Sequence, residues 1–402
     1  MPPKTVLNSS TINHILTLRY NRTQKPLLPK ITANNFQNKT PSLDHIEHLI
    51  EKPLKKIKPY PEKIAIALSG GMDSTLTLFF LKKIFLDSTV ESISIKFSDS
   101  VDESKTAAAI AEHFEVNHRI VFVDNYLKEL PKSISIVKMP FWDLHWYYVA
   151  KEASTLSKYL ASGDGGDELF GGYTFRYKKF LSLVKPNSTP IKKVKAYLEC
   201  HERDNVPDQS DLFGQKSCFT WKSIYEGLLP YFDNSLSLLD QVFLADYNGK
   251  LLYNFSLVSK RINESFNLKA ITPFLSKDMI SYAMGVSNLY KYDEKNNLGK
   301  LLFRDLLSKY NLNSLIPNKK LGFSVNTINL WNSYGEEIFE YYFDDSRIVK
   351  DGWISRGWID KHKQSKRNDV RYVNKFLGLL AFEIWYRLFV TKEIKSNTLL
   401  SF

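Results

Sequence analysis

The sequence predicts an α/β protein in which a parallel β-sheet covered by helices is followed by a mainly helical lobe. Two observations support this fold class. Between residues 60 and 175, short apolar segments alternate with segments of helical periodicity, and strands joined through helices form parallel sheets. Beyond Tyr173, most periodic segments repeat their apolar residues at three- and four-residue spacing, which is typical of amphipathic helices.

The first half of the chain contains the elements of the predicted sheet in order. Strands are expected at Ile64–Leu68, Ser92–Phe97, Arg119–Val123 and Lys158–Ala161. Helices are expected at Ser74–Ile84, Glu103–Phe114, Asp143–Ser157 and, in the second half, Val373–Phe389. Residues 1–50 are polar and rich in Asn, Thr and Pro. We therefore expect an extended N-terminal arm (1–50), an α/β core (51–180) and a helical lobe (181–402).

Length and composition restrict the class of protein. The 402 residues are enough for two or three domains, and no apolar run approaches the roughly 18–20 residues that a transmembrane helix requires. The N-terminal segment lacks the apolar core of a signal peptide. Cys200 and Cys218 lie outside the motifs described below, which argues against a disulfide framework or a cysteine-based zinc site. We expect a cytoplasmic protein with no membrane partner.

The net charge of +12 has two interpretations. It results from 55 basic and 43 acidic residues, and a basic surface is typical of proteins that bind nucleic acid. The lysines, however, are scattered in short groups such as Leu54–Lys58 and Ile191–Lys195, and the chain contains no zinc-finger or RNA-binding signature. We therefore expect a protein that handles anionic phosphates, with nucleic acid as the less favoured partner.

A glycine-rich turn, SGGMDS (residues 69–74), follows the first predicted strand directly. Ligands of open α/β sheets bind where strands end and helices begin, because a helix N-terminus offers free N–H groups to an anion. Gly70 and Gly71 allow the backbone to approach a bulky anion, and Ser69 and Ser74 can donate hydroxyl hydrogen bonds. The turn is neither a Walker A motif nor a dinucleotide fingerprint. It is predicted to hold phosphate, and a plain strand–turn–helix junction capped by serine is the alternative.

Asp73 is the unexpected residue in this turn. A carboxylate repels phosphate unless a cation lies between them, and magnesium is bound by one or two carboxylates together with phosphate oxygens. A second acidic segment, SGDGGDELFGGY (162–173), follows the predicted strand Lys158–Ala161 and is too polar to belong to the core. Because parallel strands end at the same edge of a sheet, we expect Asp73 and Asp167 to share one magnesium. A solvated acidic turn is the alternative.

These two segments resemble signatures of the asparagine synthetase family. SGGMDS matches the S-G-G-x-D-S loop of the PP-loop ATP pyrophosphatases, and SGDGGDELFGGY is similar to the second signature of the family's synthase domain. Arg261, ITPFLS (271–276) and NKKLGF (318–323) fall where the family has related motifs, so the resemblance covers about residues 60–390. It implies an adenine nucleotide alpha hydrolase-like fold. It also implies a reaction in which ATP and Mg²⁺ adenylate a carboxylate, pyrophosphate leaves, and an amine, usually ammonia, displaces AMP to form an amide.

The resemblance assigns roles by position. Pyrophosphate and magnesium would be held by Ser69, Gly70, Gly71, Asp73 and Ser74, with Asp167 as the second magnesium ligand. The rest of the nucleotide would be bordered by Leu68, Ile95, Phe97, Ser162 and Gly163. The catalytic residues would be Lys320, Asp164 and Asp167. Lys320 matches a lysine that neutralises charge developing in the transition state, and Asp164 replaces a Glu with a carboxylate one methylene shorter.

The chain departs from the family pattern in two respects. The full enzymes begin with a nucleophilic cysteine after the initiator Met, whereas this chain begins MPPKT and has no cysteine before Cys200. We therefore expect no glutaminase domain, so that nitrogen comes from free ammonia, an amine or a separate amidotransferase subunit. In the segment that corresponds to E-V-R-V-P-F-L-D, Lys269, Ile271 and Ser276 replace charged residues, which leaves open whether aspartate is the carboxylate.

The leading hypothesis is an ATP-dependent amide-forming ligase, and asparagine synthesis from aspartate and ammonia is its simplest form. One alternative is a PP-loop enzyme that modifies RNA or a peptide. Another is a catalytically silent binding subunit, and the intact acids Asp73 and Asp167 argue against it.

Overall fold

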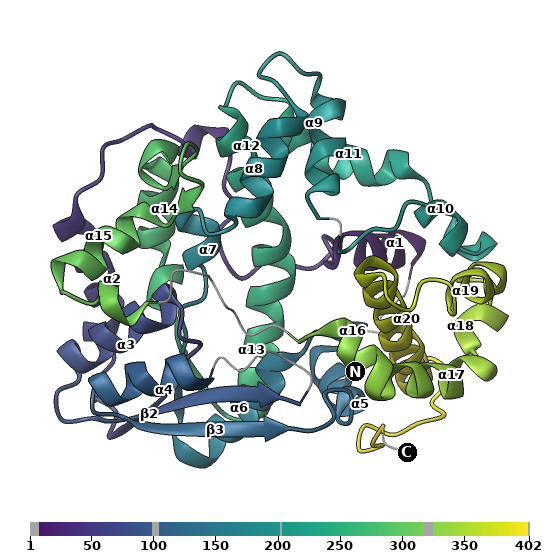
Figure 1. Ribbon diagram of the computed structural model, residues 1–402, viewed down its shortest axis with the longest axis horizontal. Helices are drawn as coiled ribbons and strands as arrows, with labels where there is room; N and C mark the ends of the chain where they lie inside the picture. The colour runs from purple at the N-terminus through teal and green to yellow at the C-terminus, as the bar shows by residue number, and fades with distance from the viewer. Residues whose placement is uncertain (1–7, 99–103, 202, 317–324, 401–402) are drawn as a thin grey trace.

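A five-stranded parallel sheet forms the base of the protein in the computed structural model, which describes residues 8–98, 104–201, 203–316 and 325–400 (Figure 1). The strand order is β3–β2–β1–β4–β5. The strands are β1 (Lys63–Ala67), β2 (Thr89–Phe97), β3 (Asn117–Val123), β4 (Tyr159–Ala161) and β5 (Lys269–Ile271). The four predicted strands are confirmed to within a few residues. The fifth strand comes from residues outside the predicted α/β core.

The central strand β1 is buried on both faces, which explains its continuous apolar sequence. Ile64 and Ile66 pack in one core cluster with residues of α3 (Met72–Ile84) and α4 (Ser104–His113). Ala65 and Ala67 point to the opposite face, into a cluster that includes residues of α6 (His145–Leu156). Because successive side chains of a strand alternate between faces, both sets must be apolar here.

The second half of the chain is mainly helical, as predicted, and Figure 1 shows it above and to the right of the sheet. Its small two-stranded sheet pairs β6 (Tyr292–Asp293) with β7 (Leu298–Gly299). The other α-helices are α5 (Leu130–Val137), α7 (Gly166–Phe170), α8 (Thr174–Leu183), α9 (Pro190–Glu199), α10 (Gln209–Leu212), α11 (Trp221–Phe232), α12 (Leu238–Asp246), α13 (Ser256–Ser265), α14 (Lys277–Gly285), α15 (Leu301–Lys309), α16 (Thr327–Leu330), α17 (Glu336–Asp344), α18 (Arg347–Lys350), α19 (Arg356–His362) and α20 (Val370–Phe389). In the described part of the chain, no helix has the length and apolar character needed to cross a membrane.

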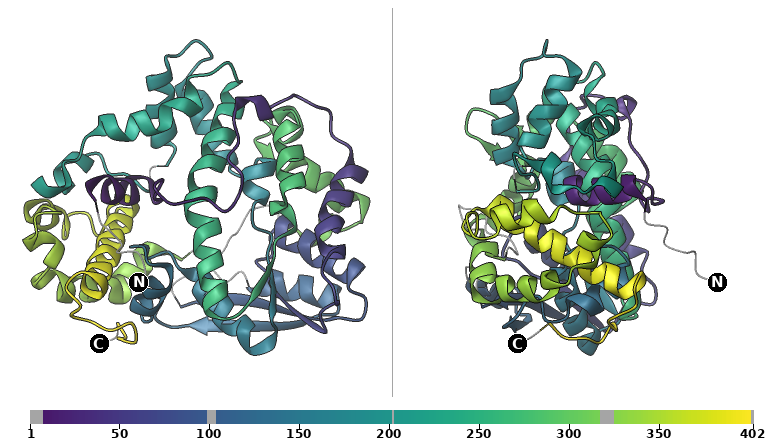
Figure 2. Two further views of the ribbon diagram at one scale, coloured as in Figure 1. Left: turned by 180° about the vertical axis from the view of Figure 1, so that it is seen from behind. Right: turned by 90° about the vertical axis from the view of Figure 1, so that its right-hand side faces the viewer.

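One long helix connects the upper helices to the sheet, as the view from behind in Figure 2 shows. It begins with α12 and ends with α13, and the turn between them, Tyr247–Phe255, is a π-helix. Its lower part, α13, packs against α5, α6 and β5. Stretches of π-helix within α-helices are frequent at functional sites.

The N-terminal fifty residues differ from the extended arm that the sequence predicts. They contain α1 (Ser9–Leu18) and the first part of α2 (Leu43–Lys55), so the predicted boundary at residue 50 falls inside a helix. Ile12, Ile15 and Leu16 of α1 are buried, and the helix contacts α11 and α20. A ten-residue helix is marginal in isolation, so it depends on this tertiary packing. The local sequence pattern was therefore too weak to predict it.

Candidate active site

Two loops meet at the carboxyl edge of the sheet, between β1 and β4. β1 pairs with β2 on one side and with β4 on the other, so the strand order reverses at this point. Ligands of open α/β sheets bind in the crevice that forms at such a reversal. The turn that contains Gly70 follows β1, and the loop that begins at Ser162 follows β4.

Asp73 lies directly against the second loop, and two glycines make this approach possible. A Cβ atom at Gly163 would lie 2.6 Å from the Cβ of Asp73. A Cβ atom at Gly166 would lie 2.5 Å from its carboxylate carbon. Since real Cβ atoms do not come this close to other atoms, both positions require glycine. The two segments predicted to form one site are therefore in contact.

A lysine that the sequence analysis missed connects the two acids. The Nζ atom of Lys300 lies 2.6 and 2.5 Å from the carboxylate oxygens of Asp73 and 2.6 Å from Oδ1 of Asp167. The Lys300 side chain is 4% exposed. Burial lowers the pKa of this ammonium group, but the nearby carboxylates of Asp167 and Asp73 more than compensate, so its pKa is raised. Asp73 and Asp167 thus converge on one cation, the ammonium group of Lys300, and the magnesium predicted to lie between them stays a prediction.

The conformation of Lys300 explains how a distant residue reaches this position. Its backbone has φ 56°, it precedes α15, and its N–H donates to the carbonyl oxygen of Phe170 at 3.1 Å. A Cβ atom at Gly172 would approach Cε of Lys300 at 2.6 Å, so the second loop also surrounds the lysine stem. Nothing in the local sequence around Lys300 distinguishes it from a surface lysine in a turn.

The first turn is held in shape by its own hydroxyl groups. Gly70 has φ 73°, and a Cβ atom there would meet Thr106 of α4 at 3.0 Å. The hydroxyl of Ser74 donates to the carbonyl oxygen of Gly71 at 3.0 Å and accepts from the N–H of Ser69 at 3.3 Å. Gly71 is the N-cap residue of α3, so the positive end of that helix lies in the turn. Ser74 stabilises the turn in this structure, and direct phosphate binding by it stays a prediction.

The residues predicted to border adenine and ribose lie at the same edge of the sheet. Leu68 follows β1, and Ile95 and Phe97 lie near the end of β2. All three are buried, and the Phe97 ring packs edge-on against Tyr126 with centroids 5.2 Å apart. The structure thus places them beside the turn, and their contact with nucleotide stays a prediction.

Asp164 occupies the side of the second loop that faces α6. The N–H of Ser162 donates to the carbonyl oxygen of Ile271 in β5 at 3.0 Å, which fixes the start of the loop. Burial raises the pKa of Asp164, and the negative charge of Asp73 adds to this effect. The hydroxyl of Ser162 and the charge of His145 oppose it. The net effect is a pKa above the usual value of an aspartate, which makes Asp164 a stronger base than an exposed carboxylate.

His145 and its partners form a second feature that the sequence analysis missed. Nδ1 of His145 lies 3.2 Å from Oδ1 of Asp143, and Asp143 forms an ion pair with Arg19 at 3.0 Å. Burial lowers the pKa of His145, but the hydrogen bond to Asp143 and the charges of Asp143 and Asp164 raise it, and the net shift is upward. The N-terminal segment, which the sequence predicts to be an extended arm, thus supports the site through Arg19.

The remaining predicted residues are dispersed. Lys320 lies outside the described residues. Lys269 is the first residue of β5 and is exposed. Its ammonium group lies 5.4 Å from the centre of the Tyr159 ring in β4. Ile271 is buried, and the hydroxyl of Ser276 caps α14. The three replacements in this motif therefore do not line one pocket.

The two loops fit a divalent cation that takes further ligands from a phosphate. The side chains of Asp73 and Asp167 are 19% and 22% exposed, and both already direct carboxylate oxygens at one cation. Among the residues that the structure describes, no group of three or more His, Cys, Asp and Glu side chains could hold a metal alone. Water and phosphate oxygens would have to complete the coordination, which matches the preference of magnesium.

Comparisons with known proteins give a consistent result. The family model described as asparagine synthase matches residues 60–387. Asparagine synthetase [glutamine-hydrolyzing] 1 of Bacillus subtilis is 26% identical over 366 residues, which are 81% of this chain and 56% of that protein. A putative asparagine synthetase of Methanocaldococcus jannaschii is 32% identical over 142 residues, 31% of this chain and 27% of that protein. The chain thus spans about half the length of the Bacillus protein, and its match to the archaeal one is shorter.

Two solved structures are also similar to this chain. NMN synthetase from Francisella tularensis is 13% identical, with a TM-score of 0.26, over 58% of this chain and 99% of that one. The NH3-dependent NAD synthetase from Campylobacter jejuni is 14% identical, with a TM-score of 0.25, over 46% of this chain and 94% of that one.

Proposed function

The chain belongs to the asparagine synthase family, and on that premise we propose that it is an ATP-dependent, AMP-forming ligase that makes amides. It would adenylate a carboxylate with release of pyrophosphate and transfer the acyl group to ammonia or an amine. The observation that carries the proposal is the convergence of Asp73 and Asp167 on one cation, beside a turn suited to phosphate.

In the first step, an oxygen of the substrate carboxylate attacks the α-phosphorus of ATP and the bond to the β-phosphate breaks. The turn formed by residues 69–74 would hold the departing pyrophosphate through N–H groups at the start of α3. Mg²⁺, held by Asp73 and Asp167, would neutralise phosphate charge. Lys300 stays protonated because its pKa is raised, so it contributes a fixed positive charge at the same place.

In the second step, an amine nitrogen attacks the acyl carbon, AMP leaves, and the nitrogen loses a proton. Asp164 is our candidate for the acceptor of that proton, because it lies on the loop that contacts Asp73 and burial raises its pKa above the usual aspartate value. By resemblance, Lys320 would stabilise the charge that develops on the phosphate and the intermediate.

Asparagine synthesis from aspartate and ammonia is the simplest reaction of this class. The nitrogen source is free ammonia, a larger amine, or a separate amidotransferase subunit, and the enzyme would work in the cytoplasm, where ATP is available.

The test measures ATP–pyrophosphate exchange against a panel of carboxylates that includes aspartate, followed by product analysis with ammonium, glutamine and primary amines. We expect exchange with at least one carboxylate, and AMP rather than ADP on addition of the amine. Asp73→Asn should abolish exchange, whereas Asp87→Asn, the same change at an exposed position after α3, should not. Absence of exchange with every carboxylate would favour the silent subunit, and exchange only with RNA or peptide would favour those substrates.

A further inference from the structure

A cavity of about 330 Å³ opens beside the second loop, on the face of the sheet covered by α6. Leu160 of β4 and Ala270 of β5 are register partners and form its floor. Its walls are formed by Trp146 of α6, by the Leu27–Leu28 segment and by the lower half of the long helix. Ser162 and Asp164 lie at the end of β4 and connect the cavity to the candidate active site.

The walls of this cavity are mainly apolar. They include Leu251 and Phe255 of the π-helical turn as well as Leu268 and Leu275. Leu275 also packs against Gly165, which has φ 93°, so the second loop and the cavity wall are in direct contact. Pockets of this size and composition, with a few polar groups at one end, are typical of small-molecule sites.

The charged and polar groups of the cavity are largely paired with each other, except at the loop end. The indole N–H of Trp146 donates to Oδ1 of Asn263 at 2.8 Å. Lys260 and Glu264 form an ion pair at 3.6 Å on the exposed side of α13, so their charges offset. Asp164 is thus the acidic side chain of the cavity at its junction with the second loop, with His145 close enough for their charges to interact.

We propose that this cavity binds the amine substrate, a primary amine with an apolar body whose ammonium group lies at Asp164. This inference rests on the proposed ligase function and specifies its nitrogen donor. By the same measure of volume, a cavity for one water-sized molecule such as ammonia needs only roughly 10–15 Å³, so this cavity is far larger than ammonia requires. A carboxylate with the same body would be repelled by Asp164, whereas an ammonium group would be attracted. The apolar walls would bind the body through the hydrophobic effect.

The same position suits the reaction. An ammonium group held by Asp164 would lie at the carboxyl end of β4, on the loop whose Gly163 and Gly166 contact Asp73. Transfer of one proton from the ammonium nitrogen to Asp164 would leave the neutral amine that attacks the acyl carbon. The proton and the nitrogen lone pair are thus accounted for without another reactant.

The experiment measures binding by calorimetry in the absence of ATP, with hexylamine, ethylamine and hexanoate as probes. We expect hexylamine to bind at least about 10-fold more tightly than either hexanoate or ethylamine. Asp164→Asn should lower the affinity for hexylamine about 10- to 100-fold, the range for a lost charge-assisted hydrogen bond, and should remove the preference over hexanoate.

Two variants place a phenylalanine in the cavity, one from β5 and one from α13. Ala270→Phe and Ser259→Phe should each abolish hexylamine binding, whereas Ala109→Phe, an equal change on the exposed side of α4, should not. Thermal melting identifies any variant that does not fold. If one of the two cavity-filling variants fails to fold, hexylamine binding by the other one tests the inference.

Equal affinity for hexanoate and hexylamine, or full binding to both folded filling variants, would overturn the inference. Because no nucleotide is present, a failed amine test leaves ATP–pyrophosphate exchange as an independent test of the proposed ligase. A protein without exchange that still binds hexylamine would contradict only the ligase function.

Discussion

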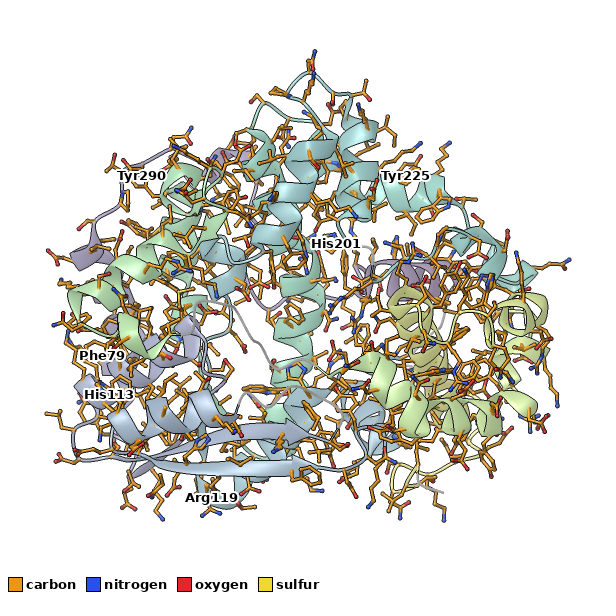
Figure 3. All side chains as sticks on the ribbon, in the orientation of Figure 1. Phe79, His113, Arg119, His201, Tyr225 and Tyr290 are labelled. Carbon is orange, nitrogen blue, oxygen red and sulfur yellow. The ribbon has the colours of Figure 1, made fainter. Side chains whose placement is uncertain are left out.

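Two buried charge clusters in this protein have opposite arrangements. The edge cluster, Asp73, Asp167 and Lys300, places one cation between two acids, and its cation is the most buried member, with 4% of the side chain exposed. The interior cluster, Arg19, Asp204 and Lys250, places one acid between two cations, and its acid is the most buried member, with 5% exposed. Asp204 follows His201, which Figure 3 labels in the interior, and its N–H donates to the His201 carbonyl oxygen at 2.8 Å.

The difference separates a binding site from a structural ion pair. The edge cluster combines two partly exposed carboxylates with one ammonium group at the carboxyl edge of the sheet, beside the turn that is suited to phosphate. In the interior cluster, burial alone would raise the pKa of Asp204, but Lys250 and Arg19 reverse this effect and its pKa is lowered. Arg19 also pairs with Asp143, so the interior charges offset each other. Such a cluster joins α1 to the lobe but offers no charge to a ligand.

The comparison predicts the largest effect on stability at Asp204. Asp204→Asn leaves Lys250 and Arg19 next to a neutral group in the interior, and breaking a buried pair in this way costs about 3–5 kcal/mol of unfolding free energy. Asp73→Asn should cost less, because Asp167 still compensates the charge of the buried Lys300 ammonium group. Urea denaturation followed by circular dichroism measures both. Equal losses of unfolding free energy in the two variants would show that the two clusters contribute equally to stability.

The effect on catalysis should have the opposite order. Asp73→Asn and Asp167→Asn should each lower ATP–pyrophosphate exchange at least about 100-fold, the usual result of removing a group that stabilises charge in the transition state. Asp204→Asn should keep the exchange rate of the native protein when rates are corrected for the folded fraction. If a folded Asp204→Asn variant lost exchange as strongly as Asp73→Asn, the interior cluster would not be purely structural.

A pH dependence of stability should arise from Lys375, which donates a hydrogen bond to the backbone of Asp204 in the interior cluster. Burial lowers the pKa of Lys375 to about 7, opposed by the charge of Asp204 and assisted by that of Arg19, while its Nζ donates to the carbonyl oxygens of Leu16 and Asp204. Above pH 7 the unfolded chain binds more protons at this lysine than the folded protein does. Stability should therefore rise by about 2 kcal/mol between pH 7 and pH 9.

Lys375→Met should remove this contribution and leave the smaller rise expected from Lys291, since burial lowers the pKa of Lys291 to about 8. The measurement is urea denaturation at several pH values, with Lys309→Met as a control at a more exposed position on α15. A rise of the same size in Lys375→Met would assign it to other groups.

The smallest predicted effect concerns the cation of the edge cluster. Lys300→Gln leaves Asp73 and Asp167 without the ammonium group, so Mg²⁺ should bind there more tightly in the absence of nucleotide. At a Mg²⁺ concentration five times the dissociation constant, the gain in stability is about 1 kcal/mol, seen as a higher melting temperature. Lys309→Gln changes the net charge equally on the same helix and should respond like the natural protein. If Mg²⁺ raised the melting temperature of Lys300→Gln and Lys309→Gln equally, Mg²⁺ and the Lys300 ammonium group would not compete for one position.

The sequence alone determined the features that depend on local periodicity and on strand direction. The strands that became β1 to β4 were predictable because their apolar runs are bounded by turn residues. The meeting of Asp73 and Asp167 was predictable because parallel strands end at one edge of a sheet. The polarity of the second loop was misleading. Glu168, Leu169 and Phe170 are buried, because they belong to α7 and this helix packs against α12, α14 and α15.

Tertiary structure decided the features that depend on contacts between distant segments. β5 has three residues and exists because β4 offers an unpaired edge, and α1 is helical because the lobe buries it. Lys300 reaches Asp73 across 227 positions of the chain, and Arg19 reaches Asp143 across 124. A contact of this kind leaves no periodic signal in the sequence. It results from how the packed elements close around each other, so the cation between the two acids became visible only in three dimensions.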